Sequence, residues 1–166
     1  MIVGLLSDSH ANVRRTVKGV QALLAAQAEI LVHCGDIEGE PVLIAMAAAI
    51  HPRNVPVYAV LGNVDEWDVT LPHFPSSTGI RVARTHIIEL DGGRKACVLH
   101  GHERLLLESA LLDERFDYVF TGHTHQRADS GPGRPRVINP GAIHRTHEPG
   151  VAVLDTMSGR VTWLDV

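Results

Sequence analysis

Side chains of the kinds that bind divalent metal ions recur at five places in the sequence, each directly after a short apolar run. Two divalent ions that hold a phosphate between them need hard oxygen and imidazole ligands, and a carboxylate that bridges both ions. Aspartate, asparagine and histidine supply that set. Glycines beside them let the backbone approach a bound ion or phosphate without a clash from a Cβ atom. The five segments are Asp8-Ser9-His10, Gly35-Asp36, Gly62-Asn63, His100-Gly101-His102 and Gly122-His123-Thr124-His125.

Two of these segments place metal-binding residue types at alternate positions. Asp8 and His10 are separated by one residue, as are His123 and His125. Side chains two positions apart in an extended segment point the same way. We therefore expect both segments to be extended, and each pair to bind at one site.

Taken singly, each of these residues has a simpler explanation. Asp8 or Asp36 alone is typical of a turn or a helix cap, because aspartate readily bonds nearby backbone amides. His100 or His123 alone is typical of a surface histidine or one with its hydrogen bonds satisfied. Five strand ends that all carry such residues are hard to obtain from turn chemistry, so the whole set predicts a metal centre.

Apolar runs and helical periodicity predict the elements that position these residues. The first helix is expected to begin at Asn12, which can cap it, and the second has Pro41 in its first turn, where proline is tolerated. Strands and helices alternate, which predicts a parallel sheet with right-handed crossovers and a ligand-binding edge at the carboxyl ends of its strands. The strands are expected at residues 2–6, 30–33 and 57–61, and the helices at 12–27 and 40–50.

The second half of the chain has a different pattern. Glycine-containing turns between apolar runs predict two antiparallel hairpins. Combined with the first half, they predict an α/β fold with two mixed β-sheets packed face to face and helices on the outside. The hairpins are expected at residues 86–99 and 151–164, a helix at 105–114, a strand at 118–121 and a Gly/Pro-rich loop at 129–135.

Length and composition fit one domain over residues 1–166 and exclude some classes of partner. The formal net charge is -4, and no run of Lys and Arg occurs, which argues against a non-specific nucleic-acid or membrane-surface binder. No apolar stretch approaches the roughly 20 residues of a membrane-spanning helix, so a cytoplasmic protein is expected. Cys34 and Cys97 lie in apolar runs and are expected to be reduced core residues.

The five segments, with Val64 and Asp65 after Gly62-Asn63, resemble the calcineurin-like metallophosphoesterases in order and spacing. The short chain and the Gly-Asn-x-Asp form are similar to the small bacterial and archaeal phosphodiesterase branch, whose relatives include a eukaryotic retromer subunit. The resemblance spans almost the whole chain. It implies a four-layer αββα sandwich, two divalent metal ions and hydrolysis of a phosphate ester.

The resemblance also implies which residues hold the ions. Asp36 would bridge them, and Mn²⁺ is the expected metal, with Ni²⁺, Fe and Zn²⁺ as alternatives. A hydroxide that bridges both ions would attack phosphorus in line. The implied ligands are Asp8, His10, Asp36 and His125 for the first ion, and Asp36, Asn63, His100 and His123 for the second.

Three residues are also expected near the reacting phosphate. Asn63 and His100 are ligands that lie beside it, and His102 either donates a proton to a substrate oxygen or orients the site. Many protein phosphatases of the superfamily have histidine after the Gly-Asn pair as a general acid, whereas this chain has Val64. The missing acid favours a small phosphodiester substrate over a phosphoprotein.

Two further segments have alternative interpretations. Asn139-Pro140-Gly141 resembles a late motif of the family and predicts either a tight turn or a contact with substrate. The loop over residues 66–77 carries Trp67, His73 and Phe74. This loop is expected to line a substrate pocket or a subunit interface of a homo-oligomer, or else to pack on the core.

Three rival functions can be compared with this interpretation. A phosphomonoesterase would use the same centre. A non-catalytic interaction scaffold of the retromer type is expected to have lost one or more of the ligands, all of which are present here. A dinucleotide-binding oxidoreductase would need a Gly-x-Gly-x-x-Gly turn after the first strand, and residues 7–12 contain no glycine.

Overall fold

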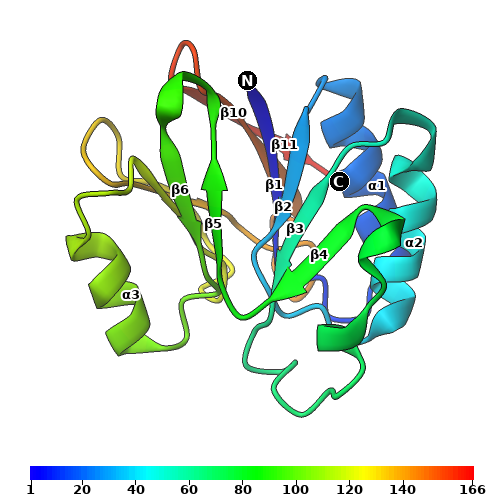
Figure 1. Cartoon of the computed structure of the whole chain (residues 1–166). Helices are drawn as coiled ribbons and strands as arrows, with labels where there is room; N and C mark the ends of the chain where they lie inside the picture. Colours follow the sequence, from blue (N-terminus) through cyan, green and yellow to red (C-terminus); the bar gives the residue numbers. More distant parts are fainter.

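The computed structural model describes residues 1–166 as two β-sheets that face each other, with helices on both outer sides (Figure 1). The predicted αββα arrangement is confirmed. The strands are β1 Ile2–Leu6, β2 Ile30–His33, β3 Val57–Val60, β4 Ile80–Ala83, β5 His86–Glu89, β6 Lys95–Val98, β7 Tyr118–Phe120, β8 Arg127–Asp129, β9 Arg136–Pro140, β10 Gly150–Asp155 and β11 Arg160–Asp165. The helices are α1 Val13–Ala25, α2 Glu40–Ile50 and α3 Arg104–Leu112, with short 3₁₀ turns at His51–Arg53, Leu71–His73, Ser76–Thr78 and Asp91–Gly93.

Both sheets are mixed. The first has the order β11-β10-β1-β2-β3-β4, in which β1 to β4 are parallel and β10 is antiparallel to β1. The second has the order β5-β6-β7-β9-β8, with β6, β7 and β9 parallel and an antiparallel strand at each edge. The two predicted hairpins are confirmed as β5-β6 and β10-β11.

Three apolar clusters hold the layers together. The largest packs α1 and α2 on the first sheet and includes Leu23 and Met46. The second lies between the sheets, where Val32 and Phe120 are fully buried, and the third packs α3 on the second sheet. Burial on both faces explains why the central strands are continuous apolar runs.

Several predicted boundaries were wrong. The sequence prediction omitted β4, which pairs with β3 in parallel without an intervening α-helix, and placed Asp129 in a loop although it ends β8. The first helix ends at Ala25 rather than near residue 27, because Gln27 takes a left-handed φ of 63°. Both missed strands are short and contain charged residues, IRVA in β4 and RAD in β8, so neither stands out as an apolar run.

The loop over residues 66–77 combines buried and exposed side chains. Phe74 is buried with Leu71 in the cluster under α2, so for this aromatic the structure favours the alternative of packing on the core. Trp67, in contrast, is 89% exposed. The loop therefore packs on the core at its second half and presents its first half at the surface.

Neither cysteine forms a disulfide, and both are buried, as predicted. Burial raises the pKa of the Cys34 thiol far above its usual range, so this thiol stays protonated. None of the three α-helices combines the length and the apolar character that crossing a bilayer takes.

Candidate metal centre

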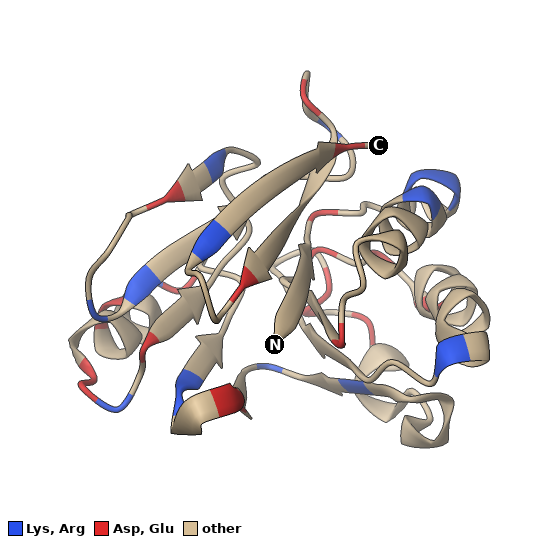
Figure 2. Ribbon diagram, turned by 90° about the horizontal axis from the view of Figure 1, so that it is seen from above, with Lys and Arg blue, Asp and Glu red and all other residues tan.

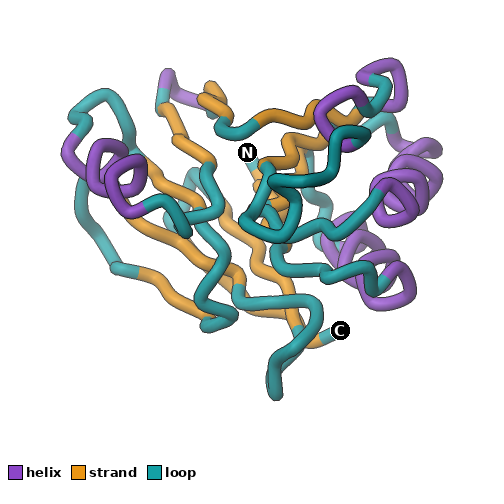
Figure 3. The backbone as a smooth tube through the Cα atoms, turned by 90° about the horizontal axis from the view of Figure 1, so that it is seen from below, coloured by secondary structure: helices purple, strands orange, loops and turns teal.

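The carboxyl ends of strands from both sheets meet at one end of the molecule, where loops gather between the layers (Figure 3). The two sheets each contribute to this end because β1, β2, β3, β6 and β7 all run toward it. All seven predicted metal ligands lie on these loops. Asp8 and His10 follow β1, Asp36 follows β2, Asn63 follows β3, His100 follows β6, and His123 and His125 follow β7.

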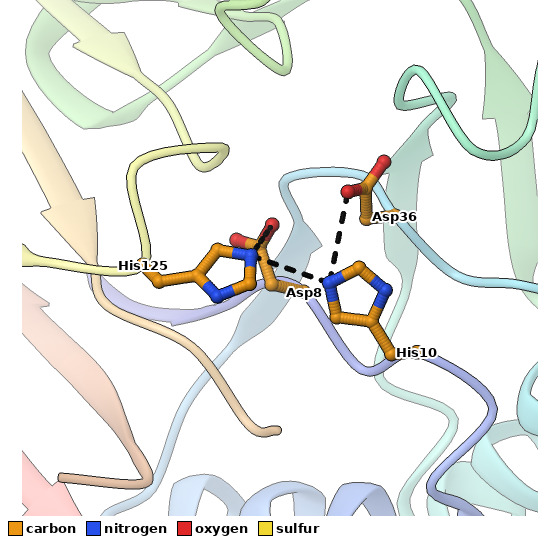
Figure 4. Close-up of side chains that lie close together, drawn as sticks. All are labelled: Asp8, His10, Asp36 and His125. Atoms are coloured by element: carbon orange, nitrogen blue, oxygen red, sulfur yellow. Dashed lines mark hydrogen bonds and ion pairs between the residues drawn. The ribbon is translucent and has the colours of Figure 1, made fainter. Parts of the chain in front are cut away.

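Four of the seven residues form a tight group. Ligand atoms of Asp8, His10, Asp36 and His125 all lie within 4.8 Å of one another (Figure 4). His125 Nε2 lies 3.2 Å from Asp8 Oδ1 and 3.2 Å from His10 Nε2, which in turn lies 3.7 Å from Asp36 Oδ2. Two carboxylates and two imidazoles that converge in this way are a suitable ligand set for a divalent cation.

The backbone at this cluster is left-handed rather than extended. The φ angles are 54° at Asp8, 44° at His10, 54° at Asp36, 67° at His123 and 58° at His125. The predicted extended geometry was therefore wrong. The Asp8 and His10 side chains do converge, whereas His125 contacts Asp8 and His10 and the His123 ring lies beside that of His100. Non-glycine residues at positive φ are strained and concentrate at functional sites, which fits a centre whose geometry is imposed by the fold.

Each of three predicted histidine ligands has its Nδ1 atom held by an oxygen. His10 Nδ1 lies 3.2 Å from Glu38 Oε2, His125 Nδ1 lies 3.1 Å from the Arg145 carbonyl, and His100 Nδ1 lies 2.7 Å from the Cys34 carbonyl. An Nδ1–H that donates to such an oxygen leaves Nε2 unprotonated and fixes the ring. In its neutral form each of these rings thus directs the Nε2 lone pair toward the centre, as metal-binding histidines do.

Buried side-chain atoms of two predicted ligands lack a hydrogen-bond partner. These atoms are Asp8 Oδ1 and His100 Nε2, and both lie among the predicted ligands. A buried polar atom without a partner is destabilising unless something else satisfies it. Cations held by the two ligand groups would satisfy these atoms, Asp8 Oδ1 in the first group and His100 Nε2 in the second, so the residues present fit divalent metal ions.

The second group of predicted ligands is more open. His100 Nε2 lies 3.2 Å from Asp36 Oδ1, and the ring centroids of His100 and His123 are 5.2 Å apart. Asn63 is exposed on its loop, next to Val64, whose amide donates to Asp36 Oδ1 over 3.2 Å. Asp36 therefore contacts both groups, the position that a bridging ligand requires.

Close backbone approaches bring these loops together. A Cβ atom at Gly62 would lie 2.1 Å from Asp36 Oδ1, and one at Gly122 would lie 2.0 Å from Ser7 Oγ. Neither position can hold a side chain without displacing the loop that carries Asp36 or Asp8. The glycines beside the predicted ligands are needed for this packing.

The environment shifts the pKa of several of these groups. Burial raises the pKa of the Asp36 carboxyl, but the contact with His100 outweighs burial and brings the pKa down to about 2. Burial lowers the pKa of His100, and its contact with Asp36 outweighs that effect and raises it. Burial also raises the pKa of Asp8 and, together with the charge of Arg145, lowers that of His10. Asp36 is therefore ionised at neutral pH and available as a ligand.

His102 lies beside the second group and is held by a residue of the 66–77 loop. Its Nε2 atom lies 3.1 Å from Glu66 Oε1, and its ring centroid is 6.2 Å from that of His123. The sequence interpretation gave no role to Glu66 or to Glu38, because neither follows a strand and neither is near its histidine in sequence.

Asn139 fastens the loop that carries His123 and His125. Its Nδ2 atom donates to the Gly122 carbonyl over 2.7 Å and to Thr124 Oγ1 over 3.1 Å, while its Oδ1 accepts from the Gly141 amide over 2.9 Å. Because both the oxygen and the nitrogen of this side-chain amide are bonded inside the protein, the structure favours the tight turn over a contact with substrate for this motif.

His33 links the two loops that carry Asp8, His10 and Asp36. The Gly35 amide donates to His33 Nδ1 over 3.2 Å, so Nε2 carries the proton and donates to Ser9 Oγ, 2.7 Å away. Burial lowers the pKa of His33 to about 3, which keeps the ring neutral. Sequence reasoning missed this residue because His33 lies inside an apolar strand and its partner is 24 positions away.

Replacing His33 by phenylalanine should weaken metal binding roughly 10- to 100-fold, the usual effect of losing a group that only orients ligands. Isothermal titration of Mn²⁺ into the variant measures this loss. His33→Gln can retain one of the two bonds and should be intermediate, and His51→Phe, at an exposed position, should match the wild type. Unchanged Mn²⁺ affinity in a folded His33→Phe protein would exclude a positioning role.

Comparison with known proteins identifies similar sequences and structures. A family model described as the calcineurin-like phosphoesterase superfamily domain matches residues 1–159. A phosphodiesterase of Methanocaldococcus jannaschii is 27% identical over 159 residues, which cover 94% of this chain and 93% of that protein.

Solved structures share the same architecture. The structure of an archaeal phosphodiesterase superposes with a TM-score of 0.85 at 25% identity, over 100% of both chains. Wild-type Vps29 from Entamoeba histolytica, solved in complex with Zn²⁺, superposes with a TM-score of 0.64 at 17% identity, over 100% of this chain and 98% of that one. At that identity the likeness to Vps29 concerns the fold alone.

Proposed function

The chain belongs to the calcineurin-like phosphoesterase superfamily, and on that premise we propose that it is a metal-dependent phosphodiesterase with a binuclear centre. The observation that carries the proposal is the convergence of Asp8, His10, Asp36 and His125 within 4.8 Å. The similarity to a phosphodiesterase over 93% of that relative's length supports a diester as substrate.

Two ligand sets are proposed, with Asp36 common to both. Asp8, His10 and His125 complete the first, and the second is completed by Asn63, His100 and His123. Mn²⁺ is the proposed metal, with Ni²⁺, Fe and Zn²⁺ as alternatives. When bound, the ions supply positive charge for the phosphoryl oxygens and a water of lowered pKa at neutral pH.

The protein side chains position the ligands and the substrate. Glu38 and the Arg145 carbonyl hold His10 and His125 so that Nε2 of each ring faces the centre. His102, held by Glu66, is proposed to donate a proton or a hydrogen bond to a substrate oxygen. Val64 offers only its backbone amide, which is bonded to Asp36, so this position supplies no general acid. The absence of that acid favours diesters with good leaving groups.

An activity assay tests the proposal. Metal-stripped protein is incubated with an aryl phosphodiester and, separately, with the aryl phosphomonoester, with Mn²⁺, Ni²⁺, Zn²⁺ or Mg²⁺ added back. We expect metal-dependent hydrolysis with a higher kcat/KM for the diester. Faster turnover of the monoester under the same metal would make the protein a phosphomonoesterase.

A non-catalytic interaction scaffold is the remaining alternative, because Vps29 shares the fold. Tight metal binding without turnover of either ester would support it. We further propose a cytoplasmic location, since two buried thiols without a disulfide fit a reducing compartment.

A further inference from the structure

The first turns of α1 carry three cations without a carboxylate partner. Arg14, Arg15 and Lys18 form no ion pair, and α1 contains no acidic residue (Figure 2). Most other arginines of the chain are paired with carboxylates, at positions 84, 94, 104, 115, 127, 134, 136 and 145. In a chain with a net charge of -4, this group is a local concentration of positive charge.

These cations surround a pocket that has only polar walls. The pocket has a volume of about 410 Å³ and is lined by the α1 basic patch, which we define as Asn12, Arg14, Arg15, Lys18 and His144. Asn12 Oδ1 accepts from the Arg15 amide, so the Asn12 side-chain NH₂ donates to His144 Nδ1, 3.3 Å away. His144 Nε2 then carries its proton and is a further donor. The patch combines donors and positive charge, the chemistry that binds a phosphate.

Backbone hydrogen bonds join two residues of the patch to the segment that carries the predicted ligands Asp8 and His10. The His144 amide donates to the Asp8 carbonyl over 3.1 Å, and the Asn12 amide donates to the Ser9 carbonyl over 2.8 Å. Both contacts are with the segment that carries Asp8 and His10. The patch therefore adjoins the segment that carries two of the predicted ligands.

The surroundings of His102, beside the second group of predicted ligands, have a different character. A pocket of about 280 Å³ beside His102 contains the carboxylates of Glu66 and Glu103, and its one arginine, Arg84, is already bonded to Glu103. The negative charge of these carboxylates disfavours a second anionic group of the substrate in this pocket. The charge around the centre is thus asymmetric, and this asymmetry gives a diester one preferred orientation.

We propose that the α1 basic patch binds a second phosphate of the substrate. One substituent of the diester carries this phosphate and lies on the side of the patch, while the other substituent, the leaving group, lies on the side of His102. The substrate class is then a small phosphodiester with an additional phosphate. This inference rests on the proposed function, because it takes the diester to be bound at the metal centre.

Binding of two product-like probes tests the proposal without relying on turnover. Thymidine 3′,5′-bisphosphate and thymidine 5′-monophosphate are titrated separately into the Mn²⁺-loaded protein. We expect the bisphosphate to bind roughly tenfold more tightly, the equivalent of one charge-assisted contact. The Arg14→Gln/Lys18→Gln double variant should bind both probes alike. The control Lys95→Gln/Arg160→Gln removes the same charge at the far end of the sheets, where β6 and β11 begin, and should behave as the wild type.

The outcomes separate this inference from the proposed function. If no ester is hydrolysed but the patch variant alone loses the preference for bisphosphate, the patch is a phosphate site and the catalytic proposal fails. If diesters are hydrolysed and both probes bind alike in every protein, the patch proposal is wrong. If a single-stranded oligonucleotide binds far more tightly than the bisphosphate, with the steep salt dependence of many phosphate contacts, the small substrate is wrong and the patch is a nucleic-acid surface.

Discussion

Asp36→Asn should lower kcat/KM for phosphodiester hydrolysis by more than about 100-fold. Replacing a residue that only orients a metal ligand usually costs roughly 10- to 100-fold, so the expected loss is larger than that. The Asp36 carboxylate contacts a histidine ring of each group of candidate ligands, His10 at 3.7 Å and His100 at 3.2 Å. Its carboxyl is ionised at neutral pH, since the contact with His100 outweighs burial and brings the pKa to about 2. An amide has the same shape but no charge, so it removes the bridge with little change in packing.

Metal binding gives a second measurement of the same variant. A ligand that binds only the folded protein raises the unfolding temperature, so Mn²⁺ should raise the Tm of the wild type and raise that of Asp36→Asn much less. Asp155→Asn is a matched control in the turn at the far end of the first sheet. Full activity of Asp36→Asn, with an unchanged Mn²⁺ effect on Tm, would rule out Asp36 as the bridging ligand.

Asp65→Ala should give the largest loss of stability. The Asp65 carboxylate is 1% exposed and accepts three backbone amides, from Ile37 at 3.0 Å, Glu38 at 2.8 Å and Gly62 at 2.8 Å. The variant leaves the Ile37 and Gly62 amides buried and unsatisfied and removes the acceptor of the part-buried Glu38 amide, so we expect the free energy of unfolding to fall by roughly 3–5 kcal/mol. Urea unfolding measures the change.

Two further variants define the origin of this effect. Asp65→Asn keeps one acceptor oxygen and should lose less stability than Asp65→Ala. Asp68→Ala removes a carboxylate that accepts from the Thr70 amide at the exposed start of the next turn, and it should lose only about 1 kcal/mol. If Asp65→Ala lost no more stability than Asp68→Ala, the three bonds to Asp65 would not be what holds the Asp36 loop against the Gly62 loop.

The sequence was sufficient to predict the layers and the longer elements. Continuous apolar runs identify β1, β2 and β3 because burial on both faces leaves no polar side, and the helical periodicity of α1 survives in any helix packed on one face. The parallel strand β4 pairs with β3, more than 20 positions earlier, and β8 is a three-residue strand with two charged residues, so their own residues carry little signal.

By itself the sequence determined the types of candidate ligand and their place after the strands, because the connection of buried strands fixes which loops share an edge. Only the tertiary structure decided which atoms meet. The left-handed backbone at Asp8, the Glu38 and Glu66 partners of the histidines, and the His33 link all result from contacts between separate loops. The cations of α1 likewise become a patch only because His144 folds beside them. Such contacts join residues far apart in the chain, and no local pattern of residues encodes them.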